Sequence, residues 1–312
     1  ATTRGALCAL AAVAFAFSLE GFGALSAPDQ AAKDAVMRGL ADPQPNDQLV
    51  EIIGIDQGSL DGVKELTDYS WPWPRAFFAN VIKVLDRAGA KAIVFDLLFL
   101  EDDLERAEFP EGTSDEALGT AAAESGRVLF AGVLREPTTA KNAHNPHPAF
   151  RDLGDQACPP WPVRQAPQVA SPPVEPIASG AMALAAANFI SDDDGVLRRM
   201  TPTYRVGDRC VPYLGLASAL GFLAADDGSF PTVTIEPGVL KVGSRTLPLD
   251  DDGRMNLDWH GPGGPAGRAQ NSFRYTPVYD VLIASQELEQ GGSTALDLSR
   301  FKDKVVLIGS TA

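Results

Sequence analysis

Residues 49–99 decide the fold, and they contain LVEIIGID (49–56), WPWPR (71–75) and KAIVFDLLF (91–99). The first and third segments are apolar runs of Val, Ile, Leu and Phe, which are typical of parallel strands buried on both faces. Two parallel strands need a crossover of about a dozen residues or more. A helix at residues 74–87 supplies it, because Pro74 suits a first helical position and apolar residues recur behind it at helical spacing. The stretch therefore predicts a β-α-β unit.

Acidic residues stand at or near the carboxyl ends of both predicted strands, Asp56 after the first and Asp96 late in the second. Open α/β sheets bind ligands beyond these ends. Asp56 and Asp96 are therefore candidates to bind a cation or a polyol. Ser310 and Thr311 would join them if the apolar run at 305–310 lies parallel beside the first two strands. The alternative is structural, since aspartate at a strand end often caps the turn or helix that follows.

The WPWPR segment also allows two interpretations. Trp71 and Trp73 would form the aromatic wall of a binding site, with Arg75 as a clamp for an anion. Alternatively, two tryptophans interleaved with prolines form a rigid plug over an edge of the core, because proline fixes its φ angle. Trp73 and Arg75 thus join the four strand-end residues as candidate ligand-binding residues.

Periodicity and turn residues predict the other elements. These are helices at 31–40, 114–124 and 278–284, a buried strand at 127–134, a hairpin followed by a helix within 196–222, and a second hairpin within 232–250. The segment at 136–176 is rich in proline and has little periodicity, which indicates an extended surface excursion. The DDDG sequences at 192–195 and 250–253 predict two turns.

Arg198 and Arg199 follow the first DDDG turn. They are expected either to meet an anionic ligand or to pair with nearby acids. Since alternate residues of a strand face opposite sides, we expect at most one of them in a cleft and the other in solvent.

Composition restricts the classes of function. The chain has 312 residues, 45% of them hydrophobic, and a formal net charge of -15. That charge argues against binding nucleic acid, which requires a basic face, and against docking on an anionic membrane surface. The sequence contains no G-x-x-x-x-G-K-[ST], G-x-S-x-G, H-E-x-x-H or C-x-x-C motif, so we expect no catalytic residue, no metal and no cofactor.

Residues 5–25, GALCALAAVAFAFSLEGFGAL, have about the length needed to cross a bilayer, and Glu20 is the only charge among them. We interpret residues 1–27 as a transmembrane anchor that starts in the cytoplasm. The alternatives are a cleaved signal peptide, since Ala24-Leu25-Ser26 fits a small-x-small cleavage pattern, and a buried core helix. Either an anchor or a signal peptide places residues 28–312 outside the cytoplasm.

Cysteine usage is compatible with export. Cys8 lies in the apolar segment, so Cys158 and Cys210 are the remaining possible pair. They form a disulfide if their Cα atoms come within about 7 Å in an oxidising compartment, and otherwise they are two unrelated thiols.

Several motifs, taken in order, resemble the CHASE2 domain, an extracytoplasmic sensor module of bacterial adenylate and guanylate cyclases, histidine kinases and serine/threonine kinases. The first is IIGIDQGSL followed by WPWPRAFFANVIKVLDRAGAKAIVFDLLF; the others are NFISDDDGVLRRMTPTYRVGDRCVPYLGLASAL, LPLDDDGRMNLDWHGPGG and FKDKVVLIGSTA. Together they cover most of residues 46–312. Two features depart from the family pattern: the proline-rich segment at 136–176 looks like an insertion, and the sequence ends before the family's closing segment and transmembrane helices.

The residues and the resemblance together predict an α/β fold. We expect a mostly parallel sheet flanked by helices, three-layered and Rossmann-like, with inserted β-hairpins and a preceding N-terminal transmembrane helix. The resemblance implies that residues 28–312 are a periplasmic or extracellular sensor domain at the inner membrane of a bacterium, without catalysis of its own. The domain would pass the signal of an unknown small molecule or envelope protein to a cytoplasmic cyclase or kinase that is absent from this sequence, in a protein that acts as a homodimer.

Two rival functions remain. One is an envelope scaffold that binds another protein and no small molecule. The other is an exported hydrolase that uses Asp56 and Asp96.

Overall fold

The computed structural model of the chain describes residues 26–40, 49–135, 146–159, 169–192, 194–225, 227–259 and 273–311. The apolar stretch at 5–25 lies outside the described residues, so the anchor, signal-peptide and core-helix alternatives stay open. Within the described ranges, no helix is long and apolar enough to cross a membrane.

A seven-stranded sheet forms the centre of the fold, in the order β13-β1-β14-β2-β3-β4, with β5 also paired to β3. Its strands are β1 (Val50–Ile55), β2 (Ala92–Asp96), β3 (Val128–Arg135), β4 (Val169–Ser171), β5 (Ala183–Ala186), β13 (Arg274–Pro277) and β14 (Val305–Ser310). β4 runs antiparallel to β3, and the other pairs in the described sheet are parallel. The prediction of a mostly parallel sheet is therefore confirmed.

The crossover between β1 and β2 differs from the prediction in two respects. It contains two helices, α3 (Gln57–Thr67) and α4 (Arg75–Arg87), where one was expected. In addition, β14 lies between β1 and β2 and pairs with both, so the two strands of the predicted unit are not neighbours. The apolar sequence of a strand predicts that the strand is buried in the sheet, but it does not identify the neighbouring strands.

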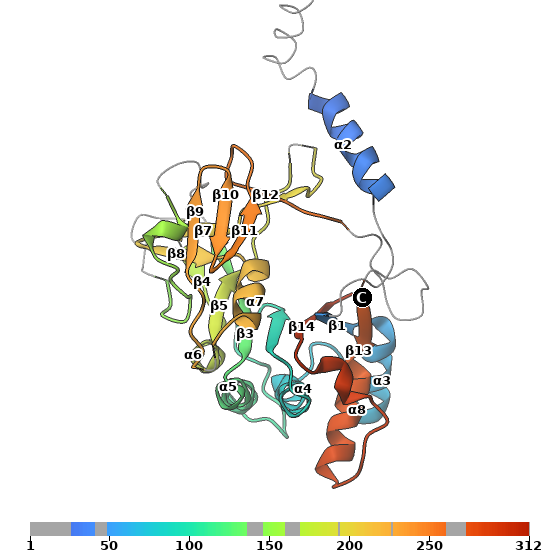
Figure 1. The fold of residues 1–312 in the computed structure, drawn as a ribbon. Coiled ribbons are helices and arrows are strands. Elements are labelled where there is room, and N and C mark those ends of the chain that lie inside the picture. Colours follow the sequence, from blue (N-terminus) through green and yellow to red (C-terminus); the bar gives the residue numbers. More distant parts are fainter. Residues whose placement is uncertain are drawn as a thin grey trace, which may run out of the picture.

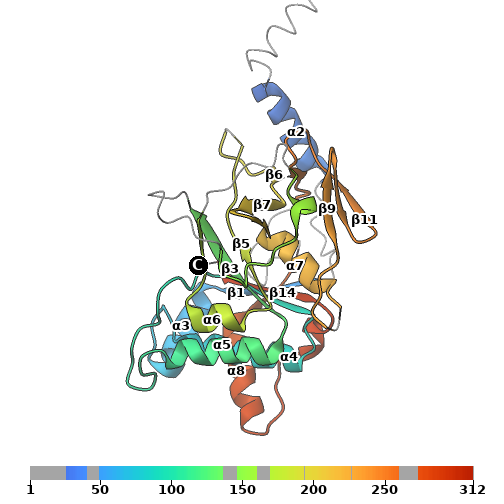
Figure 2. The ribbon, with the colours of Figure 1, turned by 90° about the vertical axis from the view of Figure 1, so that its left-hand side faces the viewer.

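Helices cover both faces of the sheet (Figures 1 and 2). On one face lie α4, α5 (Thr113–Ser125), α6 (Glu175–Gly180) and α8 (Val278–Glu289), which share the larger apolar core. On the other face lies α7 (Leu214–Phe222). Side chains along β2 alternate between the two faces of the sheet. Phe95 points into the core beneath α4, whereas Val94 packs on the α7 side.

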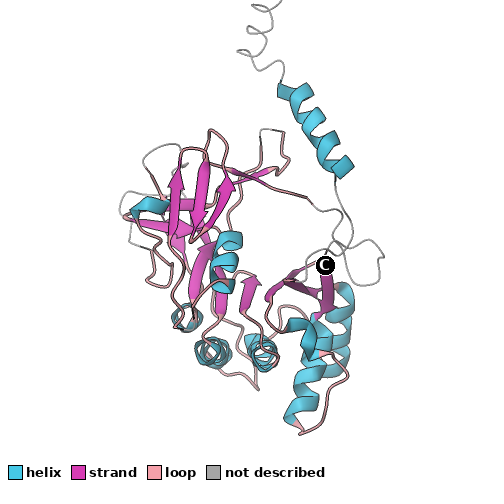
Figure 3. Ribbon diagram, in the orientation of Figure 1, coloured by secondary structure: helices cyan, strands magenta, loops and turns pink. Residues whose placement is uncertain are grey.

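Short antiparallel strands gather on the α7 side of the main sheet (Figure 3). β7 (Thr203–Val206) and β8 (Arg209–Pro212) form the first predicted hairpin. β9 (Val233–Glu236), β10 (Val239–Val242) and β11 (Arg245–Pro248) form a three-stranded meander over the second. β6 (Arg199–Met200) pairs with β12 (Met255–Asn256), and two 3₁₀ turns, η2 (Asp155–Ala157) and η3 (Leu298–Phe301), complete the elements. The predicted hairpins are confirmed.

The described parts of residues 136–176 correct the expectation of a surface excursion. Phe150 is completely buried in the main core, and Cys158 is buried beneath the three-stranded meander. Cys158 forms a disulfide with Cys210 of β8, with a Cα–Cα distance of 5.7 Å. The disulfide alternative is confirmed, and it attaches this segment to the β7–β8 hairpin.

Candidate functional site

Parallel strand ends bring the predicted polar residues to one edge of the sheet. β14 lies between β1 and β2, so the condition for Ser310 and Thr311 to join Asp56 and Asp96 is met. In the register of the sheet, Ser310 lies beside Ile55, the residue before Asp56, and Gly309 lies beside Asp96. Adjacent strands are about 5 Å apart, so Asp56 and Asp96 follow strands about 10 Å apart.

Asp56 is the N-cap of α3. Its Oδ1 accepts a hydrogen bond from the backbone N–H of Ser59 at 2.8 Å, which satisfies one of the free donors in the first turn. The capping alternative is therefore confirmed for this residue. Its second carboxylate oxygen makes no hydrogen bond to the described residues. Contact between Asp56 and a ligand remains a proposal.

Thr311 is paired with a tyrosine that sequence reasoning missed. The hydroxyl groups of Tyr275 and Thr311 are 2.7 Å apart, and desolvation by burial raises the pKa of Tyr275. The tyrosine ring lies over Gly54, where a Cβ atom would be 1.6 Å from the Tyr275 hydroxyl. A glycine inside a buried strand is a sign of such a close approach, so Gly54 was the available signal.

Asp96 stands at the end of β2 with its side chain exposed. The surrounding protein nevertheless removes part of its solvation, and this desolvation raises the pKa of Asp96. Tyr213, at the start of α7, lies close enough to be affected, since burial and then the charge of Asp96 raise the pKa of Tyr213. Asp96 therefore combines an exposed carboxylate with a raised pKa, and perturbed pKa values are common at functional sites.

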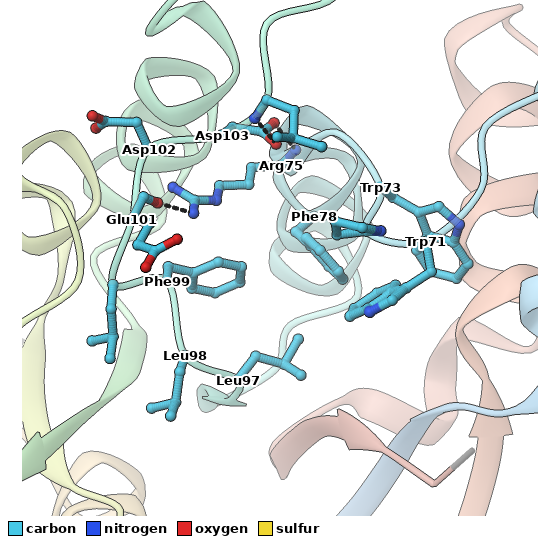
Figure 4. A pocket seen from close by; sticks show the side chains of 13 residues that line it. Trp71, Trp73, Arg75, Phe78, Leu97, Leu98, Phe99, Glu101, Asp102 and Asp103 are labelled. Atoms are coloured by element: carbon cyan, nitrogen blue, oxygen red, sulfur yellow. Dashed lines mark hydrogen bonds between the residues drawn. The ribbon is translucent and has the colours of Figure 1, made fainter.

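An aromatic cavity adjoins this edge, where the chain leaves β2. The cavity has a volume of about 390 Å³ and lies between the WPWPR segment and residues 97–104. Its apolar walls include Trp71, Trp73, Phe78 and Phe99 (Figure 4). Trp71 and Trp73 meet edge to face with ring centroids 5.3 Å apart, and Trp71 is 46% exposed whereas Trp73 is 2% exposed. Trp73 is therefore the buried part of the wall, and Trp71 is its partly exposed part.

Arg75 lines the same cavity, but its guanidinium is already paired with a carboxylate of the protein. Its guanidinium pairs with Asp115 in the first turn of α5 and donates to the carbonyl oxygen of Glu101. It also lies over the ring of Phe99, 5.2 Å from the centroid (Figure 4). The backbone N–H of Arg75 donates to Asp103 at 3.0 Å. Arg75 thus holds the loop after β2 onto α4 and α5, which is the structural alternative for this residue.

The two DDDG turns and α2 (Ser26–Leu40) meet in an ionic cluster at another part of the molecule. Arg198 binds Asp34 of α2 through Nε and Nη2 at 2.5 and 2.8 Å, and it binds Asp194 at 2.8 and 2.9 Å. The hydrogen bond from Arg198 lowers the pKa of Asp194 to about 2. Arg199 binds Asp192 at 2.7 Å. The expectation that one of the two arginines is solvated is therefore wrong, because acids from both turns surround them.

The same cluster borders a second cavity of about 730 Å³, which separates α2 from the body. Val36 and Met37 of α2 line it, and Val36 is largely exposed. In Figures 1 and 2, α2 projects from the body at the edge of the molecule. α2 is therefore joined to the body through charged groups more than through apolar packing.

No group of three or more His, Cys, Asp or Glu side chains in the described part of the chain is placed to hold a metal ion. The six candidate residues divide into Asp56, Asp96, Ser310 and Thr311 along the strand ends, and Trp73 and Arg75 in the adjoining cavity.

Comparison with known proteins gives the following. The family model of the CHASE2 domain matches residues 8–312. No curated protein and no solved structure matches the chain significantly. The match spans every motif on which the resemblance was based.

Proposed function

Because the chain belongs to the CHASE2 domain family, whose members are extracytoplasmic sensor domains, we propose that it binds a small molecule and reports that binding to an output module of a larger bacterial membrane protein. The output module we propose is an adenylate cyclase or a histidine kinase, and the full-length protein would act as a homodimer anchored by residues 1–27. The disulfide fits a periplasmic location, since disulfides persist in oxidising compartments. As a sensor domain, the chain is not itself the catalyst.

The aromatic cavity is the observation that carries the small-molecule proposal. Small-molecule sites are usually concave, mostly apolar and about 300–1,000 Å³ in volume, and the cavity of about 390 Å³ falls within that range. It lies where β2 ends, the edge at which α/β sheets bind ligands. Leu97, which lines the cavity, directly follows Asp96 at the end of β2, and Asp96 itself is not part of the lining.

A thermal-shift screen of the 312-residue chain tests this proposal, with metals, sugars, organic acids, nucleotides, quinone analogues and amines as ligands. A ligand at a hundred times its dissociation constant should stabilise the fold by about 2.7 kcal/mol. Trp71→Ala should abolish the shift, because it removes the exposed face of the wall. Trp259→Ala is the matched control, since Trp259 is 48% exposed but lies on the other side of the fold, where it donates to the carbonyl of Leu197.

The scaffold rival makes the opposite prediction. It is favoured by the exposure of Leu98 and Leu104 at the mouth of the same cavity, since exposed apolar patches also mark protein interfaces. If a well-folded chain binds no member of the library, the protein-partner function replaces the small-molecule function.

A sensor must also pass its state to the segment that enters the membrane, and we propose α2 as that connection. A ligand shifts the output only by its difference in affinity for two arrangements of the domain, and a helix held mainly by charges is suited to have two positions. Isolated helices of about 12–15 residues are marginal in water, so α2 should be protected from exchange only while docked. Arg198→Gln is expected to raise the amide hydrogen-exchange rates of residues 26–40 by about tenfold, measured by mass spectrometry.

Arg205→Gln is the matched control for that experiment. Arg205 binds Asp155 and the carbonyl of Cys158 and makes no described contact with α2. High salt should have a smaller effect than Arg198→Gln in the unmodified chain, because the Asp34–Arg198 pair is largely buried and salt screens such pairs less than exposed ones. Unchanged exchange of α2 in both experiments would contradict the connection.

A further inference from the structure

A row of aromatic rings forms one wall of the cavity. In Figure 4, Phe78 and Phe99 lie between Trp71 at one end and Glu101 at the other. The ring centroids are 6.4 Å apart for Trp71 and Phe78 and 5.8 Å apart for Phe78 and Phe99, and both pairs meet edge to face. Aromatic side chains interact with further rings at such spacings. The wall therefore offers its contacts to an uncharged ligand that contains a ring.

Arg75 is the cation that lines the cavity, and it contributes a flat surface more than a free charge. Its side chain is 11% exposed, and its guanidinium pairs with Asp115 and donates to the carbonyl oxygen of Glu101. The same guanidinium lies over the ring of Phe99, 5.2 Å from the centroid. A planar guanidinium that is stacked on a ring extends the apolar wall.

Asp115 holds Arg75 in this position from outside the cavity lining. The residue is 1% exposed and lies in the first turn of α5, where the helix N-terminus favours a carboxylate. One carboxylate oxygen accepts from the Arg75 guanidinium, and the other accepts from the backbone N–H of Asp103 at 2.9 Å. An anionic ligand would have to take Arg75 from this carboxylate and leave Asp115 buried without its cation, which is costly. Asp115 therefore opposes the binding of anions in the cavity.

Acidic groups lie at one end of the cavity only. Glu101 and Asp102 are exposed there, at the end away from the tryptophans (Figure 4). Asp103 is already occupied by Arg106 and by the backbone N–H of Arg75. A positive charge placed among the rings would meet the guanidinium of Arg75 and no unpaired carboxylate of the described residues, and a charge without a partner is costly to desolvate. The middle of the cavity thus disfavours charge of either sign.

We infer that the cavity binds an uncharged aromatic ligand, and that Asp115 sets this preference through Arg75. Asp115 is in this sense a positioning residue, because it acts on the ligand only through the arginine that it holds. This inference rests on the proposed sensor function and names the ligand class of the same site.

The test compares three indoles of similar shape and different charge on the 312-residue chain at neutral pH. The probes are tryptophol, which is neutral, indole-3-acetate, which is an anion, and tryptamine, which is a cation, and calorimetric titration measures their binding. Tryptophol is expected to bind more tightly than either charged analogue, and about tenfold or more tightly than indole-3-acetate, because the anion finds no unpaired cation in the cavity. Trp71→Ala should weaken the binding of tryptophol, whereas Trp259→Ala, which removes a similarly exposed tryptophan elsewhere, should not.

Asp115→Asn tests the positioning role. The amide is neutral and of the same shape, so it frees the Arg75 guanidinium, and the affinity for indole-3-acetate should rise by about tenfold while that for tryptophol stays unchanged. A loss of packing alone would weaken both ligands and leave the ratio of their affinities unchanged. Asp115→Ser is the second variant if Asp115→Asn does not fold. Asp86→Asn is the control, since Asp86 pairs with Arg127 at the other end of α4 and should leave both affinities unchanged.

The inference is wrong if indole-3-acetate or tryptamine binds the unmodified chain as tightly as tryptophol, or if tryptophol does not bind below about 10 mM. It is also wrong if a folded Asp115 variant keeps the preference of the unmodified chain for tryptophol. A charged compound whose binding is lost in Trp71→Ala would then preserve the sensor function and refute only the ligand class. A folded chain that binds nothing in the wider library would refute both.

Discussion

Removing the disulfide between Cys158 and Cys210 is expected to lower the free energy of unfolding by about 4 kcal/mol. The two residues are 52 positions apart, and in the chain-entropy model a cross-link that closes a loop of that length constrains the unfolded state by about this amount. Since domains are typically stable by about 5–15 kcal/mol, the loss is a large part of the total. Urea denaturation of Cys158→Ala/Cys210→Ala against the unmodified chain measures it.

The expected effect is local as well as global. Both cysteines are buried beneath β9 and β10, next to Val233 and Leu240. Loss of the bridge should therefore loosen the meander before the main sheet. A reducing agent should destabilise the unmodified chain and leave the double variant unchanged, which is the control. A double variant within about 1 kcal/mol of the unmodified chain would contradict the prediction.

Replacing Arg300 with Met is expected to destabilise the fold by about 3 kcal/mol. Arg300 pairs with Glu51 of β1, which is completely buried, and Thr276 donates to the same carboxylate oxygen at 3.0 Å. The other oxygen of Glu51 is buried and has no hydrogen-bond partner among the described residues. Removing one member of a buried ion pair costs about 3–5 kcal/mol because the remaining charge is left in the core. The lower figure applies, since the side chain of Arg300 is 31% exposed and the pair is partly screened.

A double-mutant cycle separates the buried charge from the lost contact. Glu51→Gln combined with Arg300→Met removes both charges and should recover about half or more of the loss caused by Arg300→Met alone. Lys241→Met is the control for a surface pair, because Lys241 and Glu236 are both exposed, and it should cost less than about 1 kcal/mol. If Arg300→Met costs no more than Lys241→Met, Glu51 is solvated in the folded protein and the prediction fails.

Much of the fold could be predicted from the sequence because buried parallel strands have a clear local sequence pattern. The runs that become β1, β2, β3 and β14 are apolar on both faces, and the structure places the strands within these runs to within a residue, except that β2 ends at Asp96, three residues before the predicted run does. α3 was missed although Asp56 is a suitable N-cap for it. Gly58 and Gly62 fall within this helix, and glycine lowers helix propensity by about 1 kcal/mol per residue, which obscures the helical signal.

The candidate site could be predicted only in part. Asp56, Asp96, Ser310 and Thr311 share one edge because parallel strands point their carboxyl ends the same way, and this follows from the strand assignments. The partner of Arg75 could not be found in this way. Asp115 is 40 positions away, in a helix with no local feature that links it to the WPWPR segment. The sequence therefore left the anion clamp and the structural role of the WPWPR segment as open alternatives, and the Asp115 pair decides for the structural role of Arg75.

The sequence by itself determined the family, the α/β class, the strands and the polar residues at their ends. Runs of apolar residues mark buried parallel strands, and the residue that follows each run lies at the carboxyl end of its strand. The tertiary structure decided which elements are neighbours. It placed β14 between β1 and β2 and paired Arg75 with Asp115. The net charge at a site is the sum of the charges of all groups that are close to it in space. That sum depends on contacts between distant parts of the chain, which no local pattern records.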